Sequence, residues 1–141
     1  MRTFKTIGLL CLLAGGTAVA QTTAPASTGA APPQAQVTEL MTKALKDYPG
    51  KEALMITVVY PPGSVDPVHR HNAHAFVYVL EGSIVMSLNG GKEVTLTPGQ
   101  TFYEGPDDVH TVGRNASLTK PAKFVVLLLK NQNEPVLRVV P

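Results

Sequence analysis

The stretch that decides the fold runs from residue 63 to residue 82 and reads GSVDPVHRHNAHAFVYVLEG. Its second half is rich in β-branched, aromatic and apolar residues, which is typical of a strand. Its first half holds His69 and His71. In an extended chain this spacing of two places both imidazoles on one face, about 7 Å apart before the side chains converge. Because converging neutral imidazoles bind transition metals well, the stretch predicts metal ligands carried on a strand.

A second stretch, residues 99–110, reads GQTFYEGPDDVH and contains the last of the four histidines, His110. His110 follows a tight turn that the Gly, Pro and Asp residues at 105–108 favour, and it begins another strand-like run. On that later strand, His110 can complete a face of three histidines together with His69 and His71.

Around these two stretches, the chain reads as strand after strand from residue 53 onward. The runs rich in β-branched and aromatic residues are separated by turn signals, of which Asn89-Gly90 is the strongest. These strand-like runs are residues 54–60, 76–88, 92–97, 100–104, 109–113, 122–129 and 136–140. Short strands with connections too brief for βαβ crossovers predict an all-β sandwich or small barrel.

The first twenty residues are typical of an export signal. Arg2 and Lys5 give a positive start, residues 7–14 (IGLLCLLA) form an apolar run, and residues 18–20 (AVA) form a small-residue cleavage site. This apolar segment is shorter than the roughly 20 residues needed to cross a bilayer, so we expect cleavage rather than an anchor. The mature protein is then expected to be periplasmic or secreted, and not held at a membrane.

Cleavage also changes the charge and the cysteine content. The whole chain has 12 Lys and Arg residues against 10 Asp and Glu residues, and loss of Arg2 and Lys5 leaves 10 against 10. Without a basic excess, a nucleic-acid partner is not expected. The single cysteine, Cys11, leaves with the signal, so we expect neither a disulfide nor thiol chemistry in the mature protein.

The mature chain divides into a leader and one domain. Residues 21–36 (QTTAPASTGAAPPQAQ) carry no charge and no large apolar side chain, which predicts a flexible leader before a domain over residues 37–141. The start of this domain is ambiguous. Apolar side chains in residues 37–46 fall on one helical face, and Glu39 and Lys43 are a favourable i,i+4 pair. The pattern alone therefore predicts a short amphipathic helix there.

The two histidine stretches resemble the two sequence motifs of the cupin family, in the forms Gly63-x5-His69-x-His71-x10-Gly82 and Gly99-x10-His110. The resemblance covers about residues 51–130. It implies a single-domain jelly-roll β-barrel, also called a double-stranded β-helix, that holds one divalent metal. His69, His71 and His110 match the three metal-binding histidines of the family. Cupins also often begin with a strand and form homodimers, so the resemblance favours a strand over residues 37–46 and a homodimer.

The chain departs from the cupin pattern at one ligand position. The family's first motif supplies a glutamate as fourth ligand, and the matching position is Ala75. A site of three histidines alone is neutral, and it should bind metal less tightly and leave more positions open. His74, beside Ala75, is a candidate replacement ligand or base, with a place at the pocket mouth as the alternative. Glu104 is a candidate general base or extra ligand, with a solvated strand end as the alternative.

Together these features predict an exported metal-binding cupin with a small-molecule ligand. The resemblance implies a dioxygenase-like or related metalloenzyme that uses Fe, Mn, Ni, Cu or Zn, and three histidines alone do not select among these metals. The alternative is a non-catalytic protein that binds a small molecule or metal as a sensor, carrier or accessory. A base beside the metal, from His74, Glu104 or a tyrosine, would favour the enzyme.

Overall fold

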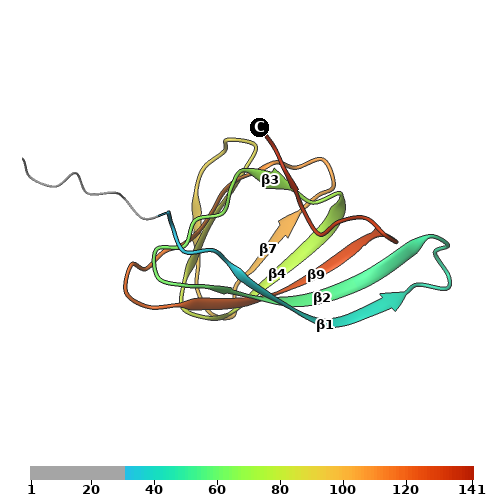
Figure 1. The fold of residues 1–141 in the computed structure, drawn as a ribbon, viewed down its shortest axis with the longest axis horizontal. Helices are drawn as coiled ribbons and strands as arrows, with labels where there is room; N and C mark the ends of the chain where they lie inside the picture. The colour runs from blue at the N-terminus through green and yellow to red at the C-terminus, as the bar shows by residue number, and fades with distance from the viewer. Residues whose placement is uncertain (1–30) are drawn as a thin grey trace, which may run out of the picture.

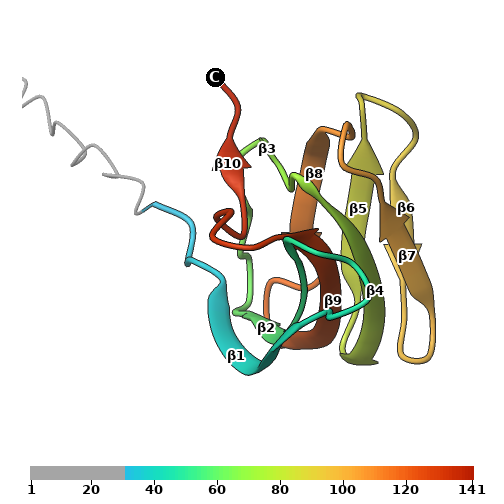
Figure 2. The same cartoon turned by 90° about the vertical axis from the view of Figure 1, so that its right-hand side faces the viewer.

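The structure, a computed structural model, describes residues 31–141, which form ten β-strands and no helix. Two antiparallel five-stranded sheets make the walls of a barrel (Figures 1 and 2), which confirms the predicted all-β jelly-roll. The predicted export signal and residues 21–30 of the predicted leader lie outside the described residues. Within residues 31–141, no helix has the length and apolar character that a membrane crossing requires.

The first sheet is built from the long strands of the chain. In spatial order it contains β1 (Gln36–Ala44), β2 (Lys51–Tyr60), β9 (Ala122–Asn131), β4 (Ala73–Glu81) and β7 (Thr101–Glu104). The predicted domain boundary at residue 37 thus lies one residue inside β1. The second sheet contains β10 (Arg138–Val139), β3 (His69–Arg70), β8 (His110–Asn115), β5 (Ile84–Leu88) and β6 (Val94–Leu96). This order places β3 next to β8, so the two histidine stretches become neighbours.

The core lies between the two sheets and follows the alternation of the strands. Successive side chains of a strand point to opposite faces, and in β2, β4 and β9 every second residue is buried. The buried side chains of β2 are Leu54, Ile56, Val58 and Tyr60. Burying an aliphatic side chain contributes about 1.5–3 kcal/mol, so these three strands supply much of the stabilising apolar surface and fix which face of each looks inward.

Residues 37–44 lie in the edge strand β1, which confirms the strand that the cupin resemblance favours, and the helix that their pattern alone predicts is wrong. All nine residues of β1 are exposed, and the strand pairs with β2 along its length, with a bulge between Glu39 and Met41. The apolar periodicity therefore does not mark a buried helical face. Pairing with β2 satisfies the backbone hydrogen bonds of this segment, whereas an isolated helix this short is marginal in water.

The strand-like run 76–88 is divided into β4 and β5 by a turn at Gly82. This glycine has φ +69°, and a Cβ built on it would lie 2.5 Å from the Pro121 carbonyl oxygen and 2.7 Å from Ala122 Cα. Only glycine fits both the left-handed backbone and the close approach of the neighbouring segment. After this turn the chain continues as β5 in the second sheet, so the turn connects the two walls of the barrel.

Asn115, at the end of β8, joins the end of β2 to the loop between β8 and β9. Its side-chain nitrogen donates hydrogen bonds to the carbonyl oxygens of Tyr60, Pro61 and Lys120 at 2.8–3.1 Å. Its side-chain oxygen accepts the Ser117 N–H at 2.8 Å. The side chain is buried. If it were removed, water could not take its place as the hydrogen-bond partner of these backbone groups.

We expect Asn115→Ala to destabilise the protein by about 2–3 kcal/mol, because it leaves several buried backbone groups without a partner. Urea unfolding of the metal-free protein measures this change. Arg114→Ala is the control, since this exposed neighbour on β8 has only the surface Glu93 as an ion-pair partner, at 2.7 Å. Equal midpoints for the two variants would contradict the role given to Asn115.

Candidate metal centre

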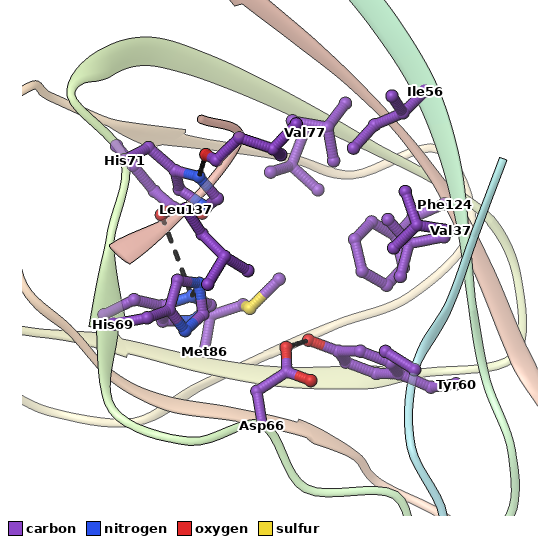
Figure 3. Close-up of a pocket in the computed structure, with 16 residues that line it drawn as sticks. Val37, Ile56, Tyr60, Asp66, His69, His71, Val77, Met86, Phe124 and Leu137 are labelled. Carbon is purple, nitrogen blue, oxygen red and sulfur yellow. Dashed lines mark hydrogen bonds and ion pairs between the residues drawn. The ribbon is translucent and has the colours of Figure 1, made fainter. Parts of the chain in front are cut away.

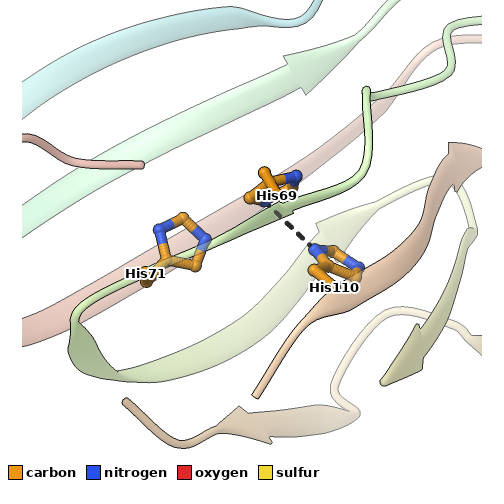
Figure 4. Close-up of side chains that lie close together, drawn as sticks. All are labelled: His69, His71 and His110. Carbon is orange, nitrogen blue, oxygen red and sulfur yellow. Dashed lines mark hydrogen bonds between the residues drawn. The ribbon is translucent and has the colours of Figure 1, made fainter. Parts of the chain in front are cut away.

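The structure brings His69, His71 and His110 together inside the barrel (Figure 4). His69 on β3 and His110 on β8 are directly paired across the sheet, and His71 follows β3 in the turn to β4. The ring centroid of His69 lies 4.9 Å from the ring centroid of His71 and 4.8 Å from that of His110. One nitrogen from each ring lies within 4.8 Å of the other two. The predicted histidines thus form one cluster.

Hydrogen bonds to backbone carbonyls fix the tautomers of two of these rings. His69 Nδ1 lies 2.8 Å from the Pro67 oxygen, and His71 Nδ1 lies 2.5 Å from the Val136 oxygen. A carbonyl oxygen only accepts, so each Nδ1 carries the proton and donates it. Each Nε2 therefore keeps its lone pair, which is the arrangement that metal-binding histidines adopt.

His110 keeps one buried nitrogen without a protein partner. Its Nδ1 lies 3.3 Å from His69 Nε2, and its Nε2 is buried with no hydrogen bond to any described residue. The His110 nitrogen that faces the other two rings is thus Nδ1. Three imidazoles that each place one nitrogen within 4.8 Å of the other two are a donor set that fits a divalent transition metal.

Burial also holds two of the imidazoles in the neutral form that binds metals. It lowers the pKa of His71, and it lowers the pKa of His110 to about 3 together with the nearby His69 and His71. The charged form of a buried histidine is penalised by the loss of hydration. Both rings are therefore neutral ligands at ordinary pH without first having to lose a proton to the metal.

Glu104 at the end of β7 adds a carboxylate to this cluster. Its side chain is only 4% exposed, and Oε2 lies 3.6 Å from His71 Nε2 and 3.7 Å from His110 Nδ1. Burial raises the pKa of Glu104 to about 7, with smaller contributions from Asp108 and Asp66. Because both imidazoles are neutral, these contacts do not supply the positive charge that would stabilise an ionised Glu104.

The structure does not bring His74 to the cluster. Along β4, Ala73 and Ala75 point inward and are buried, whereas His74 lies on the exposed outer face. There its Nδ1 shares a 2.7 Å hydrogen bond with the Tyr103 hydroxyl, and the two rings stack. The suggestion that His74 replaces the missing ligand, or acts as a base, is therefore wrong, because the strand alternation turns its side chain away.

A cavity of about 80 Å³ adjoins the histidines between the two sheets (Figure 3). Most of its wall is apolar, from residues such as Ile56, Val58, Val77, Met86, Phe124 and Val126. Its partly exposed rim includes Val37 from β1 and Leu137 from the C-terminal segment. The cluster therefore faces a small, mostly apolar space with an opening to solvent.

Tyr60 and Asp66 form a polar pair in this cavity that the sequence analysis did not single out. The Tyr60 hydroxyl donates a hydrogen bond to Asp66 Oδ2, and the two point toward each other across the cavity from His71 (Figure 3). Burial raises the pKa of both groups above their ordinary values. The only sequence signal is that Asp66 precedes His69 by three residues, which does not reveal its partner.

Gly113 on β8 keeps this pair close to the histidine cluster. A Cβ built there would lie 2.9 Å from His110 Cε1, 3.1 Å from the Tyr60 hydroxyl oxygen and 3.2 Å from Asp66 Oδ2. The backbone of β8 therefore passes between the three side chains only because residue 113 has no side chain. The cluster and the Tyr60–Asp66 pair thus belong to one continuous site.

Comparisons with known proteins agree with the fold. A double-stranded β-helix protein from Klebsiella pneumoniae matches with TM-score 0.60 and 16% identity, over 77% of this chain and 85% of that one. An oxalate oxidase in complex with glycolate matches with TM-score 0.58 and 25% identity, over 76% of this chain and 55% of that one. The DMSP lyase DddQ from Ruegeria pomeroyi matches with TM-score 0.54 and 22% identity, over 62% and 43%.

The chain thus spans about half the length of the two enzymes that it resembles. We found no matching protein among curated sequences. The family model for the cupin domain matches residues 56–128, which include both histidine stretches and more than half of the chain. With ten strands in two sheets and three histidines at the positions of the cupin motifs, this chain belongs to the cupin family.

Proposed function

We propose that this protein is an exported metalloenzyme of oxidoreductase or related type that acts on a small organic molecule. Its divalent transition metal, one of Fe, Mn, Ni, Cu or Zn, would be held by His69, His71 and His110. When bound, such an ion acts as a Lewis acid that polarises substrate oxygens and orients the substrate. Export rests on the sequence of residues 1–20.

The observation that carries the proposal is the buried carboxylate of Glu104 beside the histidines. An enzyme of this class needs a group that carries negative charge or exchanges a proton at the metal, and a simple binding protein does not. Glu104 lies 3.6–3.7 Å from two imidazole nitrogens and opens onto the cavity. Burial raises the pKa of Glu104 to about 7, and a dication bound beside it would lower that pKa and favour the ionised form, which can accept a proton from the substrate.

The cavity also indicates the class of substrate. An apolar cavity of about 150 Å³ accommodates benzene, so a space of about 80 Å³ takes only a few heavy atoms or the reactive end of a larger molecule. No Lys or Arg is among the residues that line it, whereas Asp66 and Glu104 are. Apart from the ion itself, a dicarboxylate would find two carboxyl groups and no basic side chain. We therefore favour an uncharged substrate with a hydroxyl or carbonyl group and an apolar body.

The structural relatives support the class of reaction and not a particular substrate. Oxalate oxidase and DMSP lyase are both enzymes that act on small organic molecules. The oxalate oxidase structure holds glycolate as a substrate analogue. Because the cavity offers no basic side chain, we do not propose oxalate as a substrate of this protein.

The test uses the mature protein from Gln21, loaded in turn with Fe²⁺, Mn²⁺ and Ni²⁺. Oxygen uptake and product formation are measured with catechols, hydroxyketones and, for comparison, oxalate. We expect turnover with an uncharged hydroxy compound and none with oxalate. Val37→Trp is the matched variant, because Val37 is 55% exposed at the rim and a larger side chain there narrows the opening without repacking the core. It should lower turnover at least about tenfold while the metal content stays unchanged.

The alternative function, a non-catalytic binding protein, has a different signature in the same experiment. A sensor or carrier would be favoured if compounds raise the melting temperature of the metal-loaded protein but are not consumed with any of the three metals. Turnover with oxalate but not with uncharged compounds would contradict the substrate class and leave the enzyme proposal standing.

A further inference from the structure

The chain lacks the carboxylate of the first cupin motif, because Ala75 stands in its place, yet a carboxylate still reaches the histidine cluster. We infer that Glu104 supplies the missing metal-binding carboxylate from the neighbouring strand. This inference rests on the proposed metal site. It assigns to that site a fourth ligand that comes from β7 instead of β4.

The register of the sheet makes this exchange geometrically simple. β4 and β7 are antiparallel neighbours, and Ala75 is directly paired with Glu104. Residues directly opposite each other in such a pair point to the same face, with Cβ atoms about 5 Å apart. A carboxylate moved from position 75 to position 104 therefore stays on the inner face and shifts by about one strand spacing, which a glutamate side chain can span.

The inner face around this pair leaves room for one side chain only. On the other side of Ala75 the register continues to Leu128 on β9 and Leu54 on β2, and both are buried. Ala75 itself is fully buried and extends no further than Cβ. Among the members of this row on β2, β9, β4 and β7, Glu104 is the one polar residue, and the small Ala75 leaves the space over β4 that a longer side chain would fill.

The carboxylate is directed at the cluster and has no basic partner. Its oxygen lies within 4 Å of imidazole nitrogens from two different elements, the turn after β3 and the strand β8. Among residues 31–141, no Lys or Arg lies within ion-pair distance of it. A buried carboxylate is costly unless it is paired or binds a metal. A dication held by the three histidines would supply the missing charge.

The turn after Glu104 holds this end of β7 in place. The Gly105 N–H donates to Asp108 Oδ2 at 2.7 Å, and Asn89 donates to Asp108 Oδ1 at 2.8 Å. This turn is thus held by its own hydrogen bonds. They anchor the backbone that carries Glu104, which limits the freedom that its side chain would lose on binding an ion.

The test measures metal affinity and not activity. The mature protein is stripped of metal with a chelator and titrated with Co²⁺ in competition with a chelating indicator, while visible absorption reports the ligands around the cobalt. We expect Glu104→Gln to raise the dissociation constant at least about tenfold, and the double variant Ala75→Glu/Glu104→Ala to restore it to within about threefold of the wild type. Glu81→Gln, which removes an exposed carboxylate at the end of β4 outside the cavity, should stay within about threefold.

The outcomes separate this inference from the proposed function. A wild-type protein that does not bind Co²⁺ overturns both. Tight binding by the wild type that Glu104→Gln leaves unchanged, or weakens no more than Glu81→Gln does, overturns the inference alone. If Glu104→Gln does not fold, as judged by circular dichroism, the double variant decides. Wild-type affinity and absorption in the double variant support the relocated ligand, and weak binding overturns it.

Discussion

Replacing His69 and His110 together by alanine is expected to abolish metal binding. The wild-type mature protein, exported natively and purified without a histidine tag, should carry close to one divalent ion per chain. The double variant should carry less than about 0.1 ion per chain, because it loses two of three imidazoles that the fold holds within 4.8 Å of one another. Inductively coupled plasma mass spectrometry measures both, and N-terminal sequencing should place the start at Gln21.

The same pair of proteins should differ in their response to added metal. A ligand present at a thousand times its dissociation constant stabilises the folded state by about 4 kcal/mol. For a domain of this size, that raises the melting temperature by roughly 15 °C. We expect this shift in the wild type and none in the double variant.

His74→Ala is the control for these two measurements. His74 is also a histidine of the first motif, but it lies on the outer face of β4, bonded to Tyr103. The His74→Ala variant should still bind about one ion per chain, and added metal should still raise its melting temperature. Absence of metal from the wild type, even after reconstitution, would remove the metalloenzyme proposal and leave a metal-free binding barrel.

Gly82→Ala, which adds one methyl group, should destabilise this protein more than a Gly→Ala substitution at any other turn. The new Cβ would lie 2.5–2.9 Å from Pro121 and Ala122, and the backbone would stay at φ +69°. The left-handed backbone costs about 1–2 kcal/mol for a residue with a Cβ, and forcing atoms into a packed site adds about 1–3 kcal/mol. We therefore expect a loss of about 3–4 kcal/mol in the free energy of unfolding, measured by urea titration of the metal-free protein.

Gly90→Ala provides a matched control, because Gly90 also has φ +69° but a Cβ built there meets nothing within 4 Å. It should cost only the backbone contribution, about 1–2 kcal/mol. The difference between the two variants isolates the steric overlap at the junction of β4 and β5. Equal losses would show that the contact with residues 121 and 122 relaxes without cost.

The sequence predicts the fold well because its signals are local. The spacing of His69 and His71, the turn at Asn89-Gly90 and the period-two runs each depend on residues that are neighbours in the chain. Strand alternation also explains why these two histidines, in an extended segment, end on the same side of the barrel. The family match over residues 56–128 confirms this part of the interpretation.

The parts that sequence could not predict depend on pairing between distant segments. The edge strand β1 forms because β2 offers it a partner. The residue pattern of 37–46 does not carry that information, and only the family resemblance favours a strand there. The place of Glu104 follows from its register with Ala75, and the Tyr60–Asp66 hydrogen bond joins a strand end to the turn of the first motif. Burial on one face of a strand can be read from a pattern, whereas the identity of the neighbour across the sheet cannot.

The C-terminal segment fixes the order in which the protein can mature. The carbonyl of Val136 orients His71, and β10 pairs with β3, the strand that carries His69. Both imidazoles therefore lack their final support until residues 136–139 have been synthesised, and Val136 comes 65 positions after His71. In an exported protein, residues 136–139 also cross the membrane after the histidines, because they come later in the chain. Metal loading would then follow translocation, so the metal would be drawn from the ions of the destination compartment and not from those of the cytoplasm.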